Sequence, residues 1–240
     1  MTGAEMNDDF IQNRGSLTIP SNTKVSLLID QEYETVGYPE MVVSGGKDSK
    51  IQAMYAENLI IKNHSPKGNR NDIEDKKLVG IKDVFIPDGS SNRLFKPTYL
   101  RTFRFIQLDI ETKKEPLIIE KYYQVTCNTP IELKAKFEID NADLDWMMNA
   151  GWRTVSICAQ DILVSDAVYE QMQYTGDSLV HNPYAAHPFG RRPFDSKLAH
   201  SVRSVAHSRR AFIRKLPKSL SSYHSILLAA LNAYRVIDPR

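Results

Sequence analysis

Cysteines are almost absent from this sequence, and their scarcity excludes a protein held together by a disulfide framework. Cys127 and Cys158 are the only two, so one bridge at most could form, and two buried thiols are the better interpretation. Neither has a histidine nearby in the sequence, which argues against a zinc site or a thiol nucleophile.

Long apolar runs are also missing. No stretch of about 18 apolar residues occurs, so the sequence predicts no membrane-spanning helix. The opening segment, MTGAEMNDDFIQNRGS, is polar and acidic and lacks the apolar centre of a signal peptide. We therefore expect no membrane partner, and the sequence leaves the compartment open.

Acidic side chains are nearly absent from residues 179–240, which carry 11 Lys and Arg but only Asp195 and Asp238, a net charge of +9. Residues 1–178 carry 20 Lys and Arg and 27 Asp and Glu, a net of −7, so the overall +2 averages two unlike parts. A basic arm of this kind can bind nucleic acid. Its aromatics are sparse and it has no binding-module motif, so we interpret it as a poorly ordered basic tail without a nucleic-acid partner.

What the sequence does contain is a series of short apolar segments separated by turn residues. Hydrophobic residues make up 42% of the chain, enough for a core. Ile51, Ala53 and Tyr55 alternate onto one face of a predicted strand. Pro87-Asp88-Gly89 predicts a turn. The Gly pair in SGGKDSK predicts another turn, and this segment lacks the spacing of a phosphate-binding loop. The predicted strands lie in KVSLLIDQEY, EMVVSGG, SKIQAMYAENLII, LVGIKDVFIP, YLRTFRFIQLDI, PLIIEKYYQVTCN and IELKAKFEI. Such spacing indicates an antiparallel β-sandwich over residues 22–138, interrupted by a polar loop in NHSPKGNRNDIEDKK.

The periodicity changes near residue 140. Asn141 is a plausible helix N-cap, and Asp143 and Asp145 would lie in the first turn, where the helix dipole favours acids. Apolar residues then recur at helical spacing from Leu144 to Ile162. We expect a helix to follow the sandwich, and we expect residues 140–178 alone to leave much of this apolar stripe, Val155 included, exposed.

Two acids among aromatics follow the predicted helix. Glu170 and Asp177 are seven residues apart, with Tyr169 and Tyr174 beside them. Hydrolysis of a glycosidic bond needs one carboxylic acid to protonate the departing oxygen and a second carboxylate to activate water or to attack carbon. An aromatic side chain can stack on a sugar ring and partly desolvate a carboxyl group. From spacing alone, the same two acids also fit an ordinary solvated surface.

Several long segments together resemble bacterial α-L-rhamnosidases of the group whose catalytic domain is a six-hairpin (α/α)6 barrel. They are SGGKDSKIQAMYAENL, KGNRNDIEDKKLVGIKDVFIPDG, YLRTFRFIQLDIETKKEPLIIE and GWRTVSICAQD followed by SDAVYEQMQYTGDS, and they cover about residues 44–178. The resemblance implies a mainly β fold with α, in which a concanavalin-like or jelly-roll β-sandwich leads into the first helices of a truncated (α/α)6 barrel. It divides the chain into a polar segment (1–21), the sandwich (22–138), the start of the catalytic domain (139–178) and a divergent tail (179–240).

The resemblance also implies roles for individual residues. The family removes terminal α-L-rhamnose from glycans and plant glycosides with inversion, and its general acid belongs to an Asp-x-x-x-x-Glu-x-x-x-x-x-Gly-Asp pattern. Glu170 matches the general acid, and Asp177 matches the later carboxylate that helps to hold the sugar. The first acid of the pattern falls on Ser165, so Asp166 is the candidate substitute, and Tyr174 is a candidate sugar contact.

After Ser178 the resemblance stops. The family's general base lies on a much later helix, and LVHNPYAAHPFG matches nothing in that part of the family. We therefore expect an α-L-rhamnosidase-like chain that carries the acid but not the base, with a tail produced by a frame disruption or a chimeric end. The alternative is a non-catalytic, carbohydrate-binding accessory sandwich. The expected partner is a rhamnose-containing carbohydrate or glycoside; no cofactor is predicted, and no acidic cluster argues for calcium.

Overall fold

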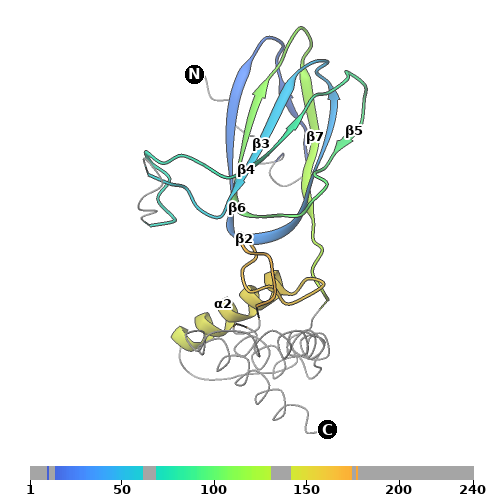
Figure 1. Cartoon of the computed structure of the whole chain (residues 1–240). Coiled ribbons are helices and arrows are strands. Elements are labelled where there is room, and N and C mark those ends of the chain that lie inside the picture. Colours follow the sequence, from blue (N-terminus) through green and yellow to red (C-terminus); the bar gives the residue numbers. More distant parts are fainter. Residues whose placement is uncertain (1–9, 11–13, 62–68, 131–141, 175–176, 178–240) are drawn as a thin grey trace, which may run out of the picture. The chain divides into compact units, whose positions relative to one another are not determined.

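The structure of the chain, a computed structural model, describes Phe10 and residues 14–61, 69–130, 142–174 and 177 (Figure 1). The chain divides into two compact units, Met1–Cys127 and Asn128–Arg240, and each is considered by itself. The predicted strand in IELKAKFEI lies outside the described residues, as do the predicted N-cap Asn141 and the basic tail of residues 179–240.

The first unit is built from antiparallel strands. They are β1 (Leu17–Ile19), β2 (Lys24–Gly45), β3 (Lys50–Ala56), β4 (Ile81–Phe85), β5 (Arg93–Phe95), β6 (Arg101–Glu111) and β7 (Leu117–Val125). Strand β1 lies in the stretch that the sequence analysis set apart as an N-terminal polar segment, and its Leu17 and Ile19 are buried.

Strand β2 joins the two layers of the sandwich, because its halves have different neighbours. Residues 24–37 pair with β6, which continues the layer through β3 and β4 and which we call sheet B. Residues 38–45 pair with β7, and Met41, Val42 and Val43 pair with β5 on the other side; with β1 they form sheet A. Figure 1 shows this long strand passing from one layer to the other. The result is the predicted antiparallel sandwich.

The prediction of separate strands in KVSLLIDQEY and EMVVSGG is wrong, because β2 runs through both segments. Gly37 and Pro39 resemble strand breakers, but both occupy positions that β2 tolerates. A Cβ on Gly37 would lie 2.4 Å from the Val125 carbonyl oxygen, so glycine permits the close approach of β7 where the strand changes layer. Pro39 pairs with Gln124 of β7, outside the short stretch that β5 covers.

The core lies between the two sheets. Ile51, Ala53 and Tyr55 share the inner face as predicted, and all three are buried. Aromatic rings span the core: Tyr55 contacts Phe103 with centroids 5.4 Å apart, and Phe85 of β4 stacks on Phe95 of β5 at 5.1 Å. Burial of each large apolar side chain contributes roughly 1.5–3 kcal/mol, which makes this core the main source of stability in the unit.

An ion pair is also buried at the edge of this core. Arg101 is 9% exposed and contacts the Asp83 carboxylate through Nε (3.0 Å) and Nη2 (2.6 Å). Its Nη1 donates to the carbonyl oxygens of Tyr99 and Leu100. The guanidinium carbon lies 5.9 Å from the centre of the Tyr55 ring. The positive charge of Arg101 is thus compensated by Asp83 and by hydrogen bonds at a site that is largely shielded from water.

The polar loop joins two segments that cover part of the outer face of sheet B. Its described residues, 69–77, form no strand and pair with the rest only at the Ile60–Lys77 bridge, which confirms the predicted loop. Phe105 of β6 is buried there against Leu59 and Leu78, which flank the loop in the sequence. Strand β6 is therefore buried on both faces at Phe105, whereas Gln107, Asp109 and Glu111 farther along the outer face are half-buried.

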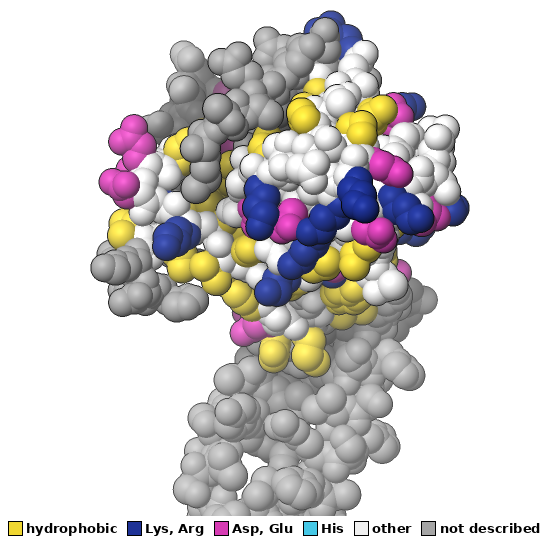
Figure 2. Space-filling model, turned by 90° about the horizontal axis from the view of Figure 1, so that it is seen from above, with side chains coloured by type: hydrophobic (Ala, Val, Ile, Leu, Met, Phe, Trp, Pro, Cys, Tyr) yellow, Lys and Arg dark blue, Asp and Glu magenta, His cyan; other side chains and the backbone are white. Residues whose placement is uncertain are grey.

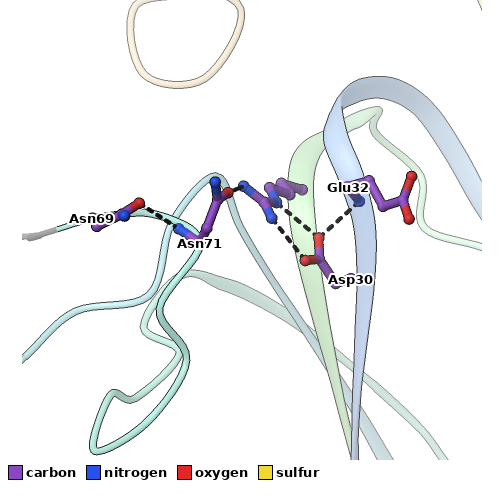
Figure 3. A network of polar contacts seen from close by, with 5 residues as sticks. Asp30, Glu32, Asn69 and Asn71 are labelled. Carbon is purple, nitrogen blue, oxygen red and sulfur yellow. Dashed lines mark hydrogen bonds and ion pairs between the residues drawn. The ribbon is translucent and has the colours of Figure 1, made fainter.

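Arg104 fastens this loop to the edge of the sheet (Figure 3). Its Nε and Nη2 each donate to the Asp30 carboxylate at 2.8 Å, and its Nη1 donates to Asn71 Oδ1 at 2.8 Å. Asp30 Oδ1 also accepts the Glu32 N–H where β2 bulges, and Glu32 has a φ of 64°. The hydrogen bonds from Arg104 hold the pKa of Asp30 below its usual value, although partial burial opposes them.

Candidate active site

The second unit contains a helix, α2 (Ala142–Cys158), which confirms the helix predicted from the change of period. The helix ends before Ile162, four residues earlier than the apolar spacing suggested. Its last carbonyl, that of Cys158, accepts the N–H groups of both Gln160 and Val164 at 3.0 Å, which turns the chain back on itself. Neither Cys158 nor Cys127 forms a disulfide bond.

The end of α2 is held by two residues that sequence reasoning did not single out. The Asn128 side-chain amide donates to the Ser156 carbonyl oxygen, and the Thr129 hydroxyl donates to that of Gln160. The Thr129 N–H donates to the Ala159 carbonyl oxygen at 2.7 Å. These bonds satisfy carbonyl groups that the helix itself leaves without partners. An Asn-Thr pair far upstream of a helix gives no local signal of this role.

A small core supports the segment after the helix. Val155 and Cys158 of α2 pack with four residues that follow the helix: Ala159, Leu163, Val164 and Ala167. The expectation that Val155 would be exposed is therefore wrong, because the chain folds back over that side of α2. Other apolar side chains are exposed instead, notably Trp146 at 71% and Met147 at 57%.

The loop that carries the candidate acid is closed by backbone hydrogen bonds. The Ser165 N–H donates to the Met172 carbonyl oxygen at 2.8 Å, and the Tyr174 N–H donates to Ser165 Oγ at 3.1 Å. Ser165, which occupies the position of the family's first acid, thus fixes both ends of the loop. Its hydroxyl oxygen accepts a backbone N–H group of the same loop.

Asp166 shapes the turn at the tip of this loop. Its Oδ1 accepts the N–H groups of Val168 and Tyr169 at 2.6 and 2.9 Å, as expected of a residue that caps a turn. Its carbonyl oxygen accepts the Gln171 N–H at 2.8 Å, and Gln171 has a φ of 50°. Hydrogen bonds to Asp166 therefore fix the backbone of this turn both before and after Glu170.

The four predicted site residues lie on or just after this turn. Glu170 is exposed at the turn, and Tyr174, 42% exposed, closes the loop through its backbone. Asp166 is half-buried, and Asp177 is exposed. The structure thus brings Asp166 and Glu170 into one hydrogen-bonded turn, with Tyr174 at its base.

Two other kinds of site are not found in the described part of the chain. No group of three His, Cys, Asp or Glu residues there is placed to hold a metal ion. No described helix is long and apolar enough to cross a membrane.

No family model and no curated protein matches this sequence. Solved structures of rhamnosidases do match its fold. A GH78-family rhamnosidase of Bacillus sp. GL1 aligns with a TM-score of 0.60 and 17% identity over 76% of this chain and 18% of that chain. A rhamnosidase from Klebsiella oxytoca with rhamnose bound aligns with a TM-score of 0.50 and 14% identity over 74% of this chain and 36% of that one.

This chain has the fold of a part of these rhamnosidases. It spans only 18% and 36% of their lengths, so they contain much that has no counterpart here. The shared fold is an antiparallel β-sandwich followed by the start of a helical domain, as the sequence predicted.

Proposed function

We propose that the chain is part of an α-L-rhamnosidase-type glycoside hydrolase and that Glu170 is its general acid. The observation that carries this proposal is the coincidence of two independent signals. The fold is similar to rhamnosidases, and the residue that matches the family's acid is exposed on a turn fixed by Asp166 and Ser165.

In this proposal Glu170 donates a proton to the glycosidic oxygen as the bond to the anomeric carbon breaks. Inversion requires a water molecule on the opposite face of the sugar, activated by a base whose carboxyl group lies roughly 6.5–9.5 Å from the acid. The Tyr174 ring, 42% exposed, would lie against the apolar face of rhamnose, and the exposed Asp177 would accept hydroxyl hydrogen bonds.

Asp166 has a more indirect role than a sugar ligand. One of its carboxylate oxygens already accepts two backbone N–H groups of the turn that carries Glu170. We therefore assign Asp166 chiefly as a positioning residue, which holds the acid in place rather than replacing the acid missing at Ser165.

The general base is not supplied by residues 142–178 in this proposal, and residues 179–240 contain only Asp195 and Asp238 as carboxylates. A substitute nucleophile that needs no deprotonation can test the acid separately. Azide would attack the anomeric carbon of phenyl α-L-rhamnoside from the opposite face. A C–N bond forms, the C–O bond breaks, and Glu170 gives its proton to the departing phenol oxygen.

The experiment incubates the full chain with phenyl α-L-rhamnoside, with and without azide, and identifies the products by NMR. Hydrolysis without azide should stay at the background rate. With azide, the β-configured glycosyl azide should form, and Glu170→Gln should reduce its rate roughly 100-fold or more. Equal azide product from Glu170→Gln would contradict the role of Glu170. Hydrolysis without azide that is lost in Asp195→Asn or Asp238→Asn would place the base within this chain.

A further inference from the structure

A β-bulge in β7 places two neighbouring charged side chains on the outer face of sheet A. Val42 of β2 pairs with Lys121, but Val43 pairs with Ile119, so Glu120 is an extra residue in the ladder. Ile119 is fully buried on the inner side. A regular strand would point either Glu120 or Lys121 into the core, whereas the bulge lets both face outward.

These two side chains help to line a hollow of about 540 Å³ on that face. Its other lining residues are Val42 in the middle of sheet A, Asn92 just before β5, and Tyr123 of β7. All five residues belong to the sandwich unit, so the hollow involves none of the residues on the loop that carries Glu170.

Tyr123 gives the hollow an aromatic wall of fixed orientation. Its ring is 37% exposed, and its hydroxyl donates to Glu40 Oε2 at 2.9 Å. This hydrogen bond to a carboxylate raises the pKa of Tyr123, so the phenol remains a neutral donor at physiological pH. Leu94, paired with Val42 and half exposed, adds apolar surface to the same face.

The polar groups of the hollow are available for a ligand. Among the residues that the structure describes, none hydrogen-bonds to the side chains of Asn92, Glu120 or Lys121. The Asn92 backbone is nevertheless fixed, because its N–H donates to Ser44 Oγ at 3.0 Å and its φ is 54°. The hollow thus offers a carboxylate acceptor, an ammonium donor and an amide that can do both.

The charges in and around the hollow cancel. Glu120 and Lys121 lie within it, and Glu40 lies 3.9 Å from Lys96 at its border. Charges of both signs are also interspersed on the end of the sandwich seen from above, where Lys and Arg lie beside Asp and Glu (Figure 2). A ligand that carries many hydroxyl groups and no charge fits this balance better than a phosphate or a polyanion.

The outer face of sheet B provides a contrast within the same sandwich. It has a hollow of about 260 Å³ lined by Lys24, Val25, Ser26, Lys50, Gln52, Asp109, Ile110 and Glu111, none of them aromatic. Here the polar groups bind one another: Ser26 Oγ donates to Asp109 at 2.7 Å, and Lys24 lies 3.1 Å from Glu111. This second hollow therefore serves as an internal control.

We propose that the hollow lined by Val42, Asn92, Glu120, Lys121 and Tyr123 is a saccharide-binding site for a neutral sugar ring of a glycan. The apolar face of the ring lies against Tyr123 and Val42, and its hydroxyl groups bind Glu120, Lys121 and Asn92. Aromatic side chains with a polar end suit a ligand that is apolar on its faces and polar at its rim. The site does not depend on the role proposed for Glu170.

Affinity electrophoresis of the full chain tests this site with three neutral polysaccharides, namely galactomannan, arabinoxylan and an α-L-rhamnan, and with polygalacturonate as the anionic probe. We expect retardation by at least one neutral polysaccharide, unchanged by added salt because no net charge is involved. Tyr123→Ala should weaken binding about ten-fold, as truncation of a central aromatic contact usually does. Glu120→Gln and Lys121→Gln, which change only surface groups, should weaken it less.

Two control variants distinguish binding at this hollow from binding elsewhere on the chain. Gln52→Ala, in the hollow of sheet B, should bind as the wild type does, and so should Lys50→Gln in the same hollow. The proposal is wrong if no neutral polysaccharide retards the wild type or if polygalacturonate alone does so. It is equally wrong if Tyr123→Ala, Glu120→Gln and Lys121→Gln all bind as the wild type does. Loss of binding in Glu170→Gln would assign the saccharide to the turn near the acid instead.

Discussion

The sandwich and the unit that begins at Asn128 differ in how they bury their apolar side chains. In the sandwich, seven paired strands enclose one core, and a smaller cluster buries Phe105 on the outer face of β6. In the described part of the second unit, six buried residues form the core around α2. Large apolar side chains are exposed in both units, among them Ile86 and Tyr99 of the sandwich and Trp146 and Met147 of the second unit, but the buried core of the sandwich is much the larger of the two.

This difference follows from how each architecture obtains its hydrogen bonds. Antiparallel strands supply partners to one another, so a sandwich is complete when its strands have paired. A helix satisfies its own backbone but buries only the side that another element covers. In the second unit that element is the returning segment from Ala159 to Ala167, together with the contacts of Asn128 and Thr129. We therefore expect the sandwich to be the more stable of the two units.

Both tryptophans, Trp146 and Trp152, lie in the second unit. Their fluorescence reports on that unit alone, whereas the β-sheet component of the far-ultraviolet circular dichroism spectrum reports on the sandwich, which contains all the described strands. Urea unfolding of the full chain followed by both signals can thus measure the comparison directly. We expect the fluorescence transition to occur at a lower urea concentration.

The largest expected change is in Arg101→Met. This substitution leaves the Asp83 carboxylate in the core without its partner, and loss of one member of a buried ion pair costs about 3–5 kcal/mol. The circular dichroism midpoint should fall sharply, while the fluorescence midpoint should move little. The double variant Arg101→Met with Asp83→Leu should recover much of the loss, because no unpaired charge remains. A fall of less than about 1 kcal/mol would show that the pair is not effectively buried.

Thr129→Val should have a smaller effect on stability, and this effect should fall on the second unit rather than on the sandwich. The new side chain keeps the shape but cannot donate to the Gln160 carbonyl oxygen, which should cost about 1 kcal/mol of the second unit's stability. The fluorescence midpoint should fall and the circular dichroism midpoint should not. Thr154→Val is the matched control, because its exposed hydroxyl only bonds back to the Ala150 carbonyl oxygen within α2. Equal effects of the two substitutions would contradict the proposed role of Thr129.

The smallest effect is expected for Asp30→Asn, and it should depend on pH. The pKa of Asp30 is lowered in the folded chain from its ordinary 3.8, so its ion pair with Arg104 stabilises the sandwich above about that pH. The benefit should disappear as the pH falls through the lowered folded value. Above pH 5 the variant should be less stable by about 0.2–1 kcal/mol, and the two proteins should converge in acid. A difference that persists undiminished at pH 2 would contradict this cause.

Much of the fold could be predicted because its signals are local. Ile51, Ala53 and Tyr55 alternate, Gly89 has the positive φ of 87° that the Pro-Asp-Gly turn needs, and α2 follows the change of period. The continuity of β2 could not be predicted, because Gly37 is explained only by the approach of Val125 from a distant strand. Likewise, the contacts of Asn128 with α2 join residues 28 positions apart.

For the candidate sites too, some residues could be predicted from the sequence and others only from the structure. Glu170 and Asp177 could be selected by resemblance, but the backbone role of Ser165 and Asp166 required the structure. The hollow at Tyr123 was missed, although the sequence contains a usable signal for it. In LIIEKYYQV, two adjacent charged residues lie within an otherwise mostly apolar strand, where a regular pleat would point one of them into the core.

The most direct test of the central claim is an NMR titration of the isotope-labelled full chain with L-rhamnose, with D-mannose as the control sugar. The account predicts that backbone amide signals from Ser165 to Tyr174 shift on addition of rhamnose, that D-mannose has little effect, and that Asp177→Asn weakens the response. Unchanged signals throughout this loop at saturating rhamnose, or equal shifts with both sugars, would contradict the claim that the turn around Glu170 is a rhamnose site.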